Sequence, residues 1–551
     1  MSGAPSPDLR AASVERLARR TFDVLVVGGG INGAVSAAAL AARGAQVALV
    51  DRADFASATS QESSCLVWGG IKYLESMELG LVFKLCQARN ELLRAYPSTV
   101  REIRFYTSHT RGFRHGRWKL LAGAWLYWAL GSGFTRPPRP LSRATMASEE
   151  PAIALDELDG GFEYSDAWLP DGDARFVWGF VRAALDHGCA AANYVEALGS
   201  VRDGAEWVTR ARDAVTGRAL DIRSRILVNA CGPYADRVNA GDGARTAHRH
   251  VLSKGIHLVV DRFTPGGRVL AFFADDGRLF FAIPLGSKTC IGTTDTPVDR
   301  PEVGVTAEDR RFVLDNINKR LRLPRPLTEA DVVAERCGVR PLAVGAAGGA
   351  GRDWMQLSRK HVIEASDGDG RLTIFGGKLT DCVNVGEEIC AEVRRLGVAL
   401  PYPDRRWYGE PPAALREEFL HQARLMGLDA LAPSGTPEPT SARLWRRHGA
   451  EAFGLLEAVR RDRRAAEPVL ACSEHLRCEL ELAAQREMVV GLEDFLRRRT
   501  GISQVVRGEV LRRDPGLEEA CRILFGEAAE ERRTAWSGGS AGAGSPREEA
   551  P

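Results

Sequence analysis

A glycine-rich turn near the N-terminus carries the strongest chemical signal in this 551-residue chain. Gly28, Gly30 and Gly33 have the GxGxxG spacing, after the apolar run FDVLVV and before a helical pattern. Gly28 permits a tight turn, Gly30 lets a pyrophosphate approach the backbone, and Gly33 lets the helix pack closely on the strand. Ile31 and Asn32 then lie at the positive end of that helix, where phosphates bind. The turn therefore predicts a dinucleotide site.

The residues that follow complete a parallel β-α-β unit. INGAVSAAALAARG (31–44) has the pattern of a helix, and AQVALVDR (45–52) has that of a second buried strand. Asp51 closes this strand, where its carboxylate can accept hydrogen bonds from an adenosine ribose. A Ser-rich loop comes next, and its hydroxyl and backbone groups can follow an extended ligand. Its candidate residues are Thr59, Ser60, Ser63 and Ser64.

A second glycine turn, late in the chain, favours FAD over a nicotinamide cofactor. Gly377, Lys378, Leu379 and Thr380 lie in FGGKLT, between an apolar strand and a helical pattern. A helix N-terminus there can stabilise the negative charge that grows at N1–C2=O when a flavin is reduced. A nicotinamide enzyme has no use for this second helix end, so the sequence predicts an FAD flavoprotein.

Composition and charge exclude several other classes of protein. Hydrophobic residues make up 44% and charged residues 26% of the chain, which is typical of globular proteins. The formal net charge is +2, so no global field favours nucleic acid and we expect no such partner. The 11 cysteines are scattered without a CxxC pair, which argues against a disulfide framework or a metal site. No run reaches the roughly 18–20 apolar residues that span a bilayer.

The order of the patterns predicts an α/β flavoprotein with several parts. Short β-rich runs between residues 248 and 295 indicate an antiparallel β-sheet that forms a substrate domain, and a Pro-rich stretch near 397–415 precedes a helical segment. Residues 20–399 form the predicted oxidoreductase region. The predicted parts are a flexible leader (1–19), a discontinuous Rossmann-like FAD-binding domain (20–75, 160–247 and 336–399), the substrate domain (76–159 and 248–335), a C-terminal α-helical domain (400–530) and a disordered tail (531–551).

A series of motifs in one order resembles a known family. They are GGGINGA, ATS-x-x-SS-x-L-x-x-GG-x-x-YLE, GFEYSD, NACGP, KGIHLVV, IGTTD, GVRPL, LSRKHVIE and FGGKLT, and they span roughly residues 20–395. Together they resemble the FAD-dependent glycerol-3-phosphate dehydrogenases of the membrane-associated respiratory type, which have a D-amino-acid-oxidase-like fold. The resemblance implies oxidation of sn-glycerol 3-phosphate to dihydroxyacetone phosphate, with hydride transfer to flavin N5 and electrons passed to a quinone.

The resemblance also implies site residues. Arg340, Arg359 and Lys378 match substrate-contacting positions, and Lys72 with Tyr73 matches an Arg-Tyr pair. These types suit the chemistry, because a dianionic phosphate needs several cations and a lysine near N1–C2=O would stabilise reduced flavin. The expected catalytic residues are Arg340, Lys378, His257 and Tyr73. The expected cofactor contacts are Gly28, Gly30, Ile31, Asn32, Gly33, Asp51, Thr59, Ser60, Ser63, Ser64, Val195, Gly232, Gly377, Lys378, Leu379 and Thr380.

The chain departs from the family pattern around the substrate. Trp68 stands where the family has a His that is a candidate base, Cys65 replaces a Lys or Arg, and Lys72 replaces an Arg. Asp381 begins Asp-Cys-Val where the family has Thr-Tyr-Arg, so His257 and Asp381 are the substitute bases to test. Two alternatives therefore stay open. One is an enzyme of the same fold for another small anionic alcohol, hydroxy acid or amine, and the other is a flavin-binding protein without turnover.

The segment 114–140 interleaves basic and aromatic residues around an apolar stretch. This pattern fits either a buried helix of the substrate domain or an interfacial helix on a lipid surface. We expect a cytoplasmic protein, with peripheral attachment to the cytoplasmic face of the inner membrane as the second option. The sequence does not set the oligomeric state, and a homodimer is one option.

Overall fold

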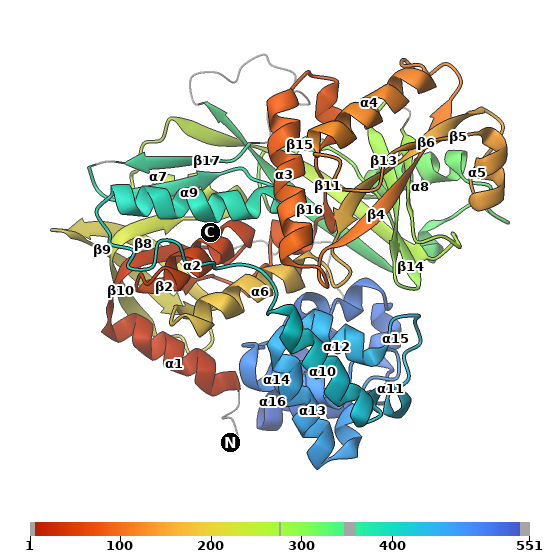
Figure 1. Cartoon of the computed structure of the whole chain (residues 1–551). Helices are drawn as coiled ribbons and strands as arrows, with labels where there is room; N and C mark the ends of the chain where they lie inside the picture. Colours follow the sequence, from red (N-terminus) through yellow and green to blue (C-terminus); the bar gives the residue numbers. More distant parts are fainter. Residues whose placement is uncertain (1–5, 275–276, 346–359, 367, 540–551) are drawn as a thin grey trace.

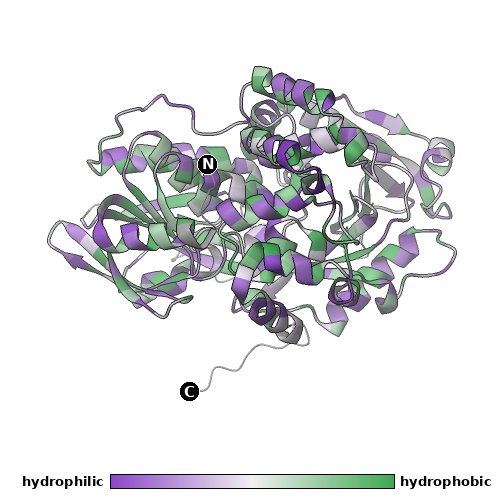
Figure 2. Cartoon of the chain, turned by 90° about the horizontal axis from the view of Figure 1, so that it is seen from below, coloured by the Kyte–Doolittle hydropathy of each residue, from purple (hydrophilic) through white to green (hydrophobic). Residues whose placement is uncertain are grey.

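Two β-sheets lie side by side, and a helical C-terminal domain packs against them (Figure 1). The computed structural model describes residues 6–274, 277–345, 360–366 and 368–539. Figure 2 shows the strands as mostly hydrophobic and the outer helices as mixed. Within the described residues, no helix is long and apolar enough to cross a membrane. The expected fold class, a Rossmann-like domain with a second sheet and C-terminal helices, is confirmed.

The first sheet has parallel strands at its centre, brought together from distant parts of the chain. Its main order is β17-β18-β10-β1-β2-β7, and β9 pairs with both β8 and β10. β1 is parallel to β2 and β10, and β10 is parallel to β18. The strands are β1 (Thr21–Val27), β2 (Val47–Val50), β7 (Ala190–Ala192), β8 (Val195–Asp203), β9 (Glu206–Asp213), β10 (Ala219–Asn229), β17 (Val362–Ser366) and β18 (Arg371–Phe375).

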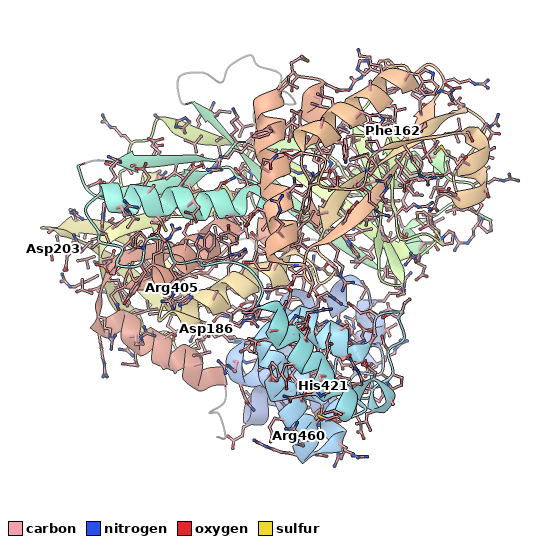
Figure 3. All side chains as sticks on the ribbon, in the orientation of Figure 1. Phe162, Asp186, Asp203, Arg405, His421 and Arg460 are labelled. Carbon is pink, nitrogen blue, oxygen red and sulfur yellow. The ribbon has the colours of Figure 1, made fainter. Side chains whose placement is uncertain are left out.

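Helices cover this sheet, which explains the continuous apolar runs of its central strands. α2 (Ile31–Ala42), α6 (Asp173–Asp186) and α9 (Cys382–Arg395) share one hydrophobic cluster with the strands. The alanines of α2 allow its neighbours to approach closely, because a methyl side chain adds little width to a helix. α7 (Ala235–Gly241) follows β10, and Figure 3 places Asp203 at the far tip of the β8–β9 hairpin.

The N-terminal segment forms helix α1 (Ser6–Arg19), which packs on another part of the first sheet. Val14 and Leu17 are buried there in a cluster with sheet residues, and Arg10 forms a buried ion pair with Asp213. The expectation of a flexible leader is therefore wrong for residues 6–19. The sheet supplies the apolar partner that the segment lacks when it is considered alone.

The second sheet has ten strands and is mostly antiparallel, in the order β15-β11-β14-β13-β12-β4-β6-β3, with β16 beside β11 and β5 beside β6. One pair, β4 and β12, is parallel, which differs from the expected antiparallel sheet; these strands are distant in sequence and share no hairpin. The strands are β3 (Leu66–Val67), β4 (Arg101–Thr110), β5 (Arg139–Leu141), β6 (Leu158–Trp168), β11 (His248–Asp261), β12 (Val269–Phe273), β13 (Leu279–Leu285), β14 (Lys288–Gly292), β15 (Thr296–Val298) and β16 (Ala334–Gly345).

Four helices belong to this part of the chain, and Figure 3 places Phe162 of β6 within it. They are α3 (Leu79–Ala95), α4 (Arg117–Leu130), α5 (Arg143–Glu149) and α8 (Ala307–Arg320). Three strands that the sequence assigned wholly or largely to the FAD-binding domain, β3, β6 and β16, pair in this second sheet instead. β16 pairs along β11 from His248 to Val259, so the GVRPL motif stands on the second sheet and not on the first.

The C-terminal domain is helical, as Figure 3 shows around His421 and Arg460. Separate hydrophobic clusters around Trp445 and Phe495 fill it. Residues 531–539 lie in its last helix, so the disordered tail is wrong for them, whereas residues 540–551 lie outside the described residues. The main elements are α10 (Ala413–Leu425), α11 (Leu428–Leu431), α12 (Thr440–His448), α13 (Ala452–Arg461), α14 (Arg477–Arg486), the π-helix η9 (Asp494–Arg499), α15 (Gly508–Arg512), α16 (Leu517–Phe525) and α17 (Ala529–Gly539).

Candidate flavin and substrate site

The first glycine turn lies between β1 and α2, where two backbones meet. Gly28 has a φ of +104°, and a Cβ there would stand 2.6 Å from the carbonyl oxygen of Ala230. A Cβ at Gly33 would overlap the carbonyl oxygen of Gly28. Neither position accepts a larger residue without moving the helix from the strand. Ser60 Oγ accepts the N–H of Ile31 at 3.0 Å, so the Ser-rich loop also contacts this turn.

Asp51 follows β2 and lies beside the same turn. Its carboxylate accepts the backbone N–H of Gly29 at 2.7 Å and that of Ala53 at 2.9 Å. Burial raises the pKa of Asp51 to about 6, although these two hydrogen bonds act in the opposite direction. The backbone N–H of Val195 donates to the Asp51 carbonyl at 2.7 Å and holds the main chain in place. The carboxylate has lone pairs left for ribose hydroxyls.

The second glycine turn, after β18, meets the first one. Asn32 Nδ2 donates to the carbonyl oxygen of Gly376 at 3.0 Å, while Asn32 Oδ1 is buried with no partner among the described residues. Gly377 has a φ of +108°, and a Cβ there would stand 3.2 Å from the Asn32 amide. The two turns form one cradle with an unused buried acceptor, and this arrangement fits a dinucleotide that reaches from one turn to the other.

The other predicted cofactor residues line the same loops. Thr59 Oγ1 donates to the carbonyl of Val339 at 2.6 Å, and Thr380 Oγ1 donates to that of Trp68 at 3.1 Å. These two bonds join the cofactor loops to the second sheet and to the loop before α3. Several predicted cofactor residues are partly exposed along the loops, among them Gly30, Ser63, Ser64, Gly232 and Leu379.

Lys378 extends from the second glycine turn toward the aromatic residues that precede α3. Its Nζ lies 4.1 Å from the ring centroid of Tyr73 and 5.9 Å from that of Trp68. The Nζ of Lys72 lies 5.7 Å from the Tyr73 ring. All three distances are within the range of cation–π attraction. Three predicted substrate residues, Lys72, Tyr73 and Lys378, are therefore neighbours.

Arg340 projects from β16 over Gly255, where any larger residue would overlap the guanidinium. It donates to Thr293 Oγ1 at 2.9 Å and to the carbonyl of Thr294 at 3.2 Å, and its Nη1 lies 3.3 Å from an oxygen of Asp295. The loop after β14 therefore fixes the direction of the guanidinium. The side chain is 26% exposed.

His257 lies in β11, opposite Gly292 of β14 and Arg336 of β16. Only 2% of its surface is exposed, and both ring nitrogens are without a partner among the described residues. Burial lowers the pKa of His257 well below its usual range, and the charges of Arg336 and Arg340 act in the same direction. The imidazole is therefore neutral, which is the form that can accept a proton.

Trp68 occupies the wall next to Lys378. Its Nε1 donates to the hydroxyl of Tyr164 at 3.4 Å, and its ring centroid lies 6.2 Å from that of Tyr73 and 6.4 Å from that of Phe281. An indole is a hydrogen-bond donor only and has no lone pair that accepts a proton near neutral pH. Trp68 therefore shapes this wall, and base chemistry must come from another residue.

The sequence interpretation missed Arg336, a fully buried arginine of β16. Its Nη1 lies 3.3 Å from Cys65 Sγ, and its Nη2 donates to the Gln61 carbonyl at 2.9 Å and to Asp173 at 3.3 Å. A cation therefore lies next to Cys65, the position where the family has a Lys or Arg. The only sign of Arg336 in the sequence was a basic residue four positions before Arg340. The periodicity of the strand does not show whether such an arginine is buried or lies on the surface.

Asp381 faces a histidine rather than the substrate side. Its carboxylate accepts from His361 Nδ1 at 2.7 Å and from Asn384 Nδ2 at 2.5 Å, and His361 Nε2 lies 2.7 Å from Glu388. Burial acts to raise the pKa of Asp381, but these bonds outweigh it and lower the pKa. The contacts do not favour Asp381 as a base. Arg359 lies outside the described residues.

Comparison with known proteins agrees with this geometry. A family model described as FAD dependent oxidoreductase matches residues 23–380, and one for the C-terminal domain of alpha-glycerophosphate oxidase matches residues 407–519. The chain is 30% identical over 523 residues to glycerol-3-phosphate dehydrogenase 2 of Mycobacterium tuberculosis, which covers 91% of this chain and 84% of that protein. It is 33% identical over 376 residues to the aerobic glycerol-3-phosphate dehydrogenase of Staphylococcus epidermidis, which covers 67% of this chain and 66% of that protein.

Among solved structures, the glycerol-3-phosphate dehydrogenase from Bacillus halodurans in complex with FAD superposes with a TM-score of 0.72. That match has 25% sequence identity and covers 98% of this chain and 99% of the other. The similarity therefore extends through the first sheet, the second sheet and the C-terminal helices together. With the cradle of two glycine turns, these matches show that the chain belongs to the FAD-dependent glycerol-3-phosphate dehydrogenase family and is a flavoprotein with FAD as its cofactor.

Proposed function

We propose that the protein oxidises sn-glycerol 3-phosphate to dihydroxyacetone phosphate. The observation that carries the proposal is the meeting of the second glycine turn with β16. A Cβ at Gly376 would stand 3.5 Å from Ala343 of β16. Gly376 is two residues before Lys378 in the chain, and Ala343 is three residues after Arg340. The turn that carries Lys378 therefore meets the strand that carries Arg340, and we expect the two cations to act on one small dianion, which needs several of them.

The residues of this junction have separate tasks in the proposal. When bound, FAD supplies the hydride acceptor at N5 for the hydrogen on C2 of the substrate. Arg340 offers a fork of donors to the phosphate, and its bonds to Thr293 and Asp295 hold the fork ready. Lys72 adds a point charge for the same group. Lys378 places positive charge at the end of the cradle where negative charge develops during reduction.

His257 takes the hydroxyl proton of the substrate in this proposal. Its nitrogens have no protein partner among the described residues, so one can accept a hydrogen bond from the substrate hydroxyl. Burial and the two neighbouring arginines lower its pKa, which keeps the ring neutral and also makes it a weak base. Tyr73 orients Lys378 through the cation–π contact. Arg359 stays a predicted phosphate ligand.

We infer that a quinone accepts the electrons and that the protein binds the cytoplasmic face of the inner membrane. Helix α4 supports the lipid contact: Trp118 is 63% exposed, Trp125 44% and Leu126 45%, while Ala124 and Tyr127 are its buried residues. Of the two options for this segment, a buried helix of the substrate domain does not fit these exposed side chains, and the interfacial helix stays a proposal. Exposed tryptophans on a helix with basic residues suit the headgroup level of a membrane, where a quinone is available.

Trp68 favours a second candidate. A bulky wall in place of a His changes the volume and the proton chemistry next to Lys378, which suits another small anionic alcohol, a hydroxy acid or an amine. That enzyme would keep the same fold, FAD and Arg340, and would differ in the group that Arg340 binds.

Anaerobic flavin absorbance tests these alternatives in the purified holoenzyme. Rapid bleaching of the oxidised band by sn-glycerol 3-phosphate, lost in Arg340→Gln and absent with the sn-1 enantiomer, is the expected result. No bleaching with that substrate, while dithionite still reduces the flavin, would contradict the proposal. Bleaching by a hydroxy acid or an amine in its place would establish the second candidate. A flavin that none of these compounds reduces would indicate a flavin-binding protein without turnover.

A further inference from the structure

The C-terminal domain reaches the cofactor region through three consecutive arginines of η9, Arg497, Arg498 and Arg499, which we term the arginine clamp. They contact residues 54–62, the segment that carries Thr59 and Ser60 and that we term the flavin loop. We propose that the arginine clamp is part of the cofactor site, because it positions the flavin loop and thereby controls how long FAD stays bound. This inference goes beyond the proposed reaction and depends on FAD alone.

One end of the flavin loop is held by Arg497. Its Nη2 donates to both carboxylate oxygens of Glu62, at 2.7 and 2.8 Å. Glu62 also accepts the backbone N–H of Cys337 at 3.1 Å. It packs closely on Gly338, because a Cβ added at Gly338 would lie only 2.9 Å from the Cβ of Glu62. Glu62 therefore joins the C-terminal domain, the flavin loop and β16, the strand that carries Arg340.

The other end is held by two arginines on one buried carboxylate. Arg498 Nε donates to Asp54 at 2.6 Å, and Arg499 donates to both Asp54 oxygens at 2.8 and 2.9 Å. Asp54 has no exposed surface, so its charge depends on these partners. Arg498 also donates to the side chain of Gln61 at 3.1 Å, inside the loop. The clamp therefore contacts the start, the interior and the end of the loop.

The loop in turn contacts the dinucleotide turn. The N–H of Ala56 donates to the carbonyl of Gly29 at 3.0 Å, and Ser60 accepts the N–H of Ile31 at 3.0 Å. Apart from the short η1 (Thr59–Gln61), the loop has no helix or strand of its own. Its order therefore depends on contacts with its surroundings, which are the buried side chain of Phe55, the bond from Thr59 to the Val339 carbonyl and the arginine clamp at its two ends. Loss of the clamp would let Ser60 leave the turn where the pyrophosphate is expected.

Another contact between the domains serves as the matched control. Glu438 pairs with Arg101 of β4 and with Arg446 of α12, so it joins the C-terminal domain to the second sheet. Among the described residues, no hydrogen bond or ion pair joins Glu438 to the flavin loop. Glu438→Gln therefore weakens the attachment of the domain without touching the loop, and it separates general adhesion from an effect on the cofactor.

The test uses full-length holoenzyme without substrate, in which released FAD is followed by its fluorescence after dilution. Arg497→Gln and Glu62→Gln are each expected to speed FAD release about tenfold, the effect of one charge-assisted contact. The double variant should release FAD no faster than the faster single variant, because both changes break one contact. Arg497→Lys should lie between Arg497→Gln and the wild type, since it keeps the charge and loses the fork.

Glu438→Gln is expected to release FAD within about twofold of the wild type, even where it lowers the melting temperature as much as Arg497→Gln does. Equal acceleration in Arg497→Gln and Glu438→Gln would overturn the inference, and so would a wild-type release rate in Arg497→Gln. If Arg497→Gln does not fold, Arg497→Lys is judged by the same comparison with Glu438→Gln. Because no substrate is present, the outcome is independent of which alcohol the enzyme oxidises.

Discussion

The two sheets hold their functional groups by different means. At the first sheet the site is made of backbone. Gly28 and Gly33 allow two backbone segments of the chain to come into contact, and Asp51 is held by backbone N–H groups. Where the first sheet faces the second, the site is made of side chains: Arg340 projects from β16 of the second sheet, and Lys378 extends from the turn after β18 of the first sheet over Tyr73. A backbone site tolerates few residue types, whereas side chains can be exchanged if their neighbours change with them.

Cys65 and Arg336 illustrate such an exchange. The family position that usually carries a cation holds a thiol here, and a guanidinium from another strand lies 3.3 Å from its sulfur. Burial raises the pKa of the Cys65 thiol, so the pair is a neutral thiol beside a fixed cation. Three of the departures from the family pattern, Cys65, Trp68 and Lys72, lie in the side-chain half of the site, whereas Asp381 follows the second glycine turn.

The largest expected effect is on the backbone half. We predict that Gly33→Ala is purified with roughly a tenth of the normal flavin or less, because its Cβ overlaps the Gly28 carbonyl and forces α2 off the strand. The measurement is the ratio of flavin to protein absorbance. Gly179→Ala in α6 is the control, since no atom lies within 4 Å of its Cβ, and it should keep its flavin and gain up to about 1 kcal/mol of stability. Full flavin content in Gly33→Ala would show that the backbone half tolerates substitution as well as the side-chain half does, which would contradict the comparison.

A change in the side-chain half should leave the flavin in place and slow the chemistry. We predict that Lys378→Met reduces the rate of flavin reduction about 100-fold under anaerobic stopped-flow conditions, with normal flavin content. Lys72→Met, which removes the other lysine beside Tyr73, should mainly raise the substrate concentration required. Loss of flavin from Lys378→Met, or a reduction rate near that of the wild type, would contradict this division of roles.

The smallest expected effect concerns His361, at the border of the two halves. Burial opposes its charge, but its bonds to Asp381 and Glu388 outweigh burial and raise its pKa. Stabilisation by the cation is therefore complete below the unfolded pKa of about 6.5 and is lost as pH rises through the higher folded pKa. His361→Gln should lower the melting temperature by about 2–4 °C at low pH, and by less at high pH. A difference between the two proteins that grows with pH would exclude this ion pair.

The cofactor half could be predicted from sequence because a strand, a glycine turn and a helix have one geometry. Asp51 is an example, since its role follows from its place at a strand end. The substrate half could not, because its contacts join residues far apart in the chain. Asp381 is hydrogen-bonded to His361, and no local sequence pattern predicts that pairing. The strand pattern of β16 likewise does not tell which sheet it joins.

The position of the arginine clamp in the chain has a consequence for biosynthesis. Asp54 is translated early, and the two arginines that neutralise it follow almost at the end. A carboxylate without those partners cannot be buried at low cost, so the nascent chain keeps this region open. If the arginine clamp positions the flavin loop as proposed, we expect FAD to be captured only after the last domain has emerged, and a polypeptide that ends before residue 497 to lack a finished binding site.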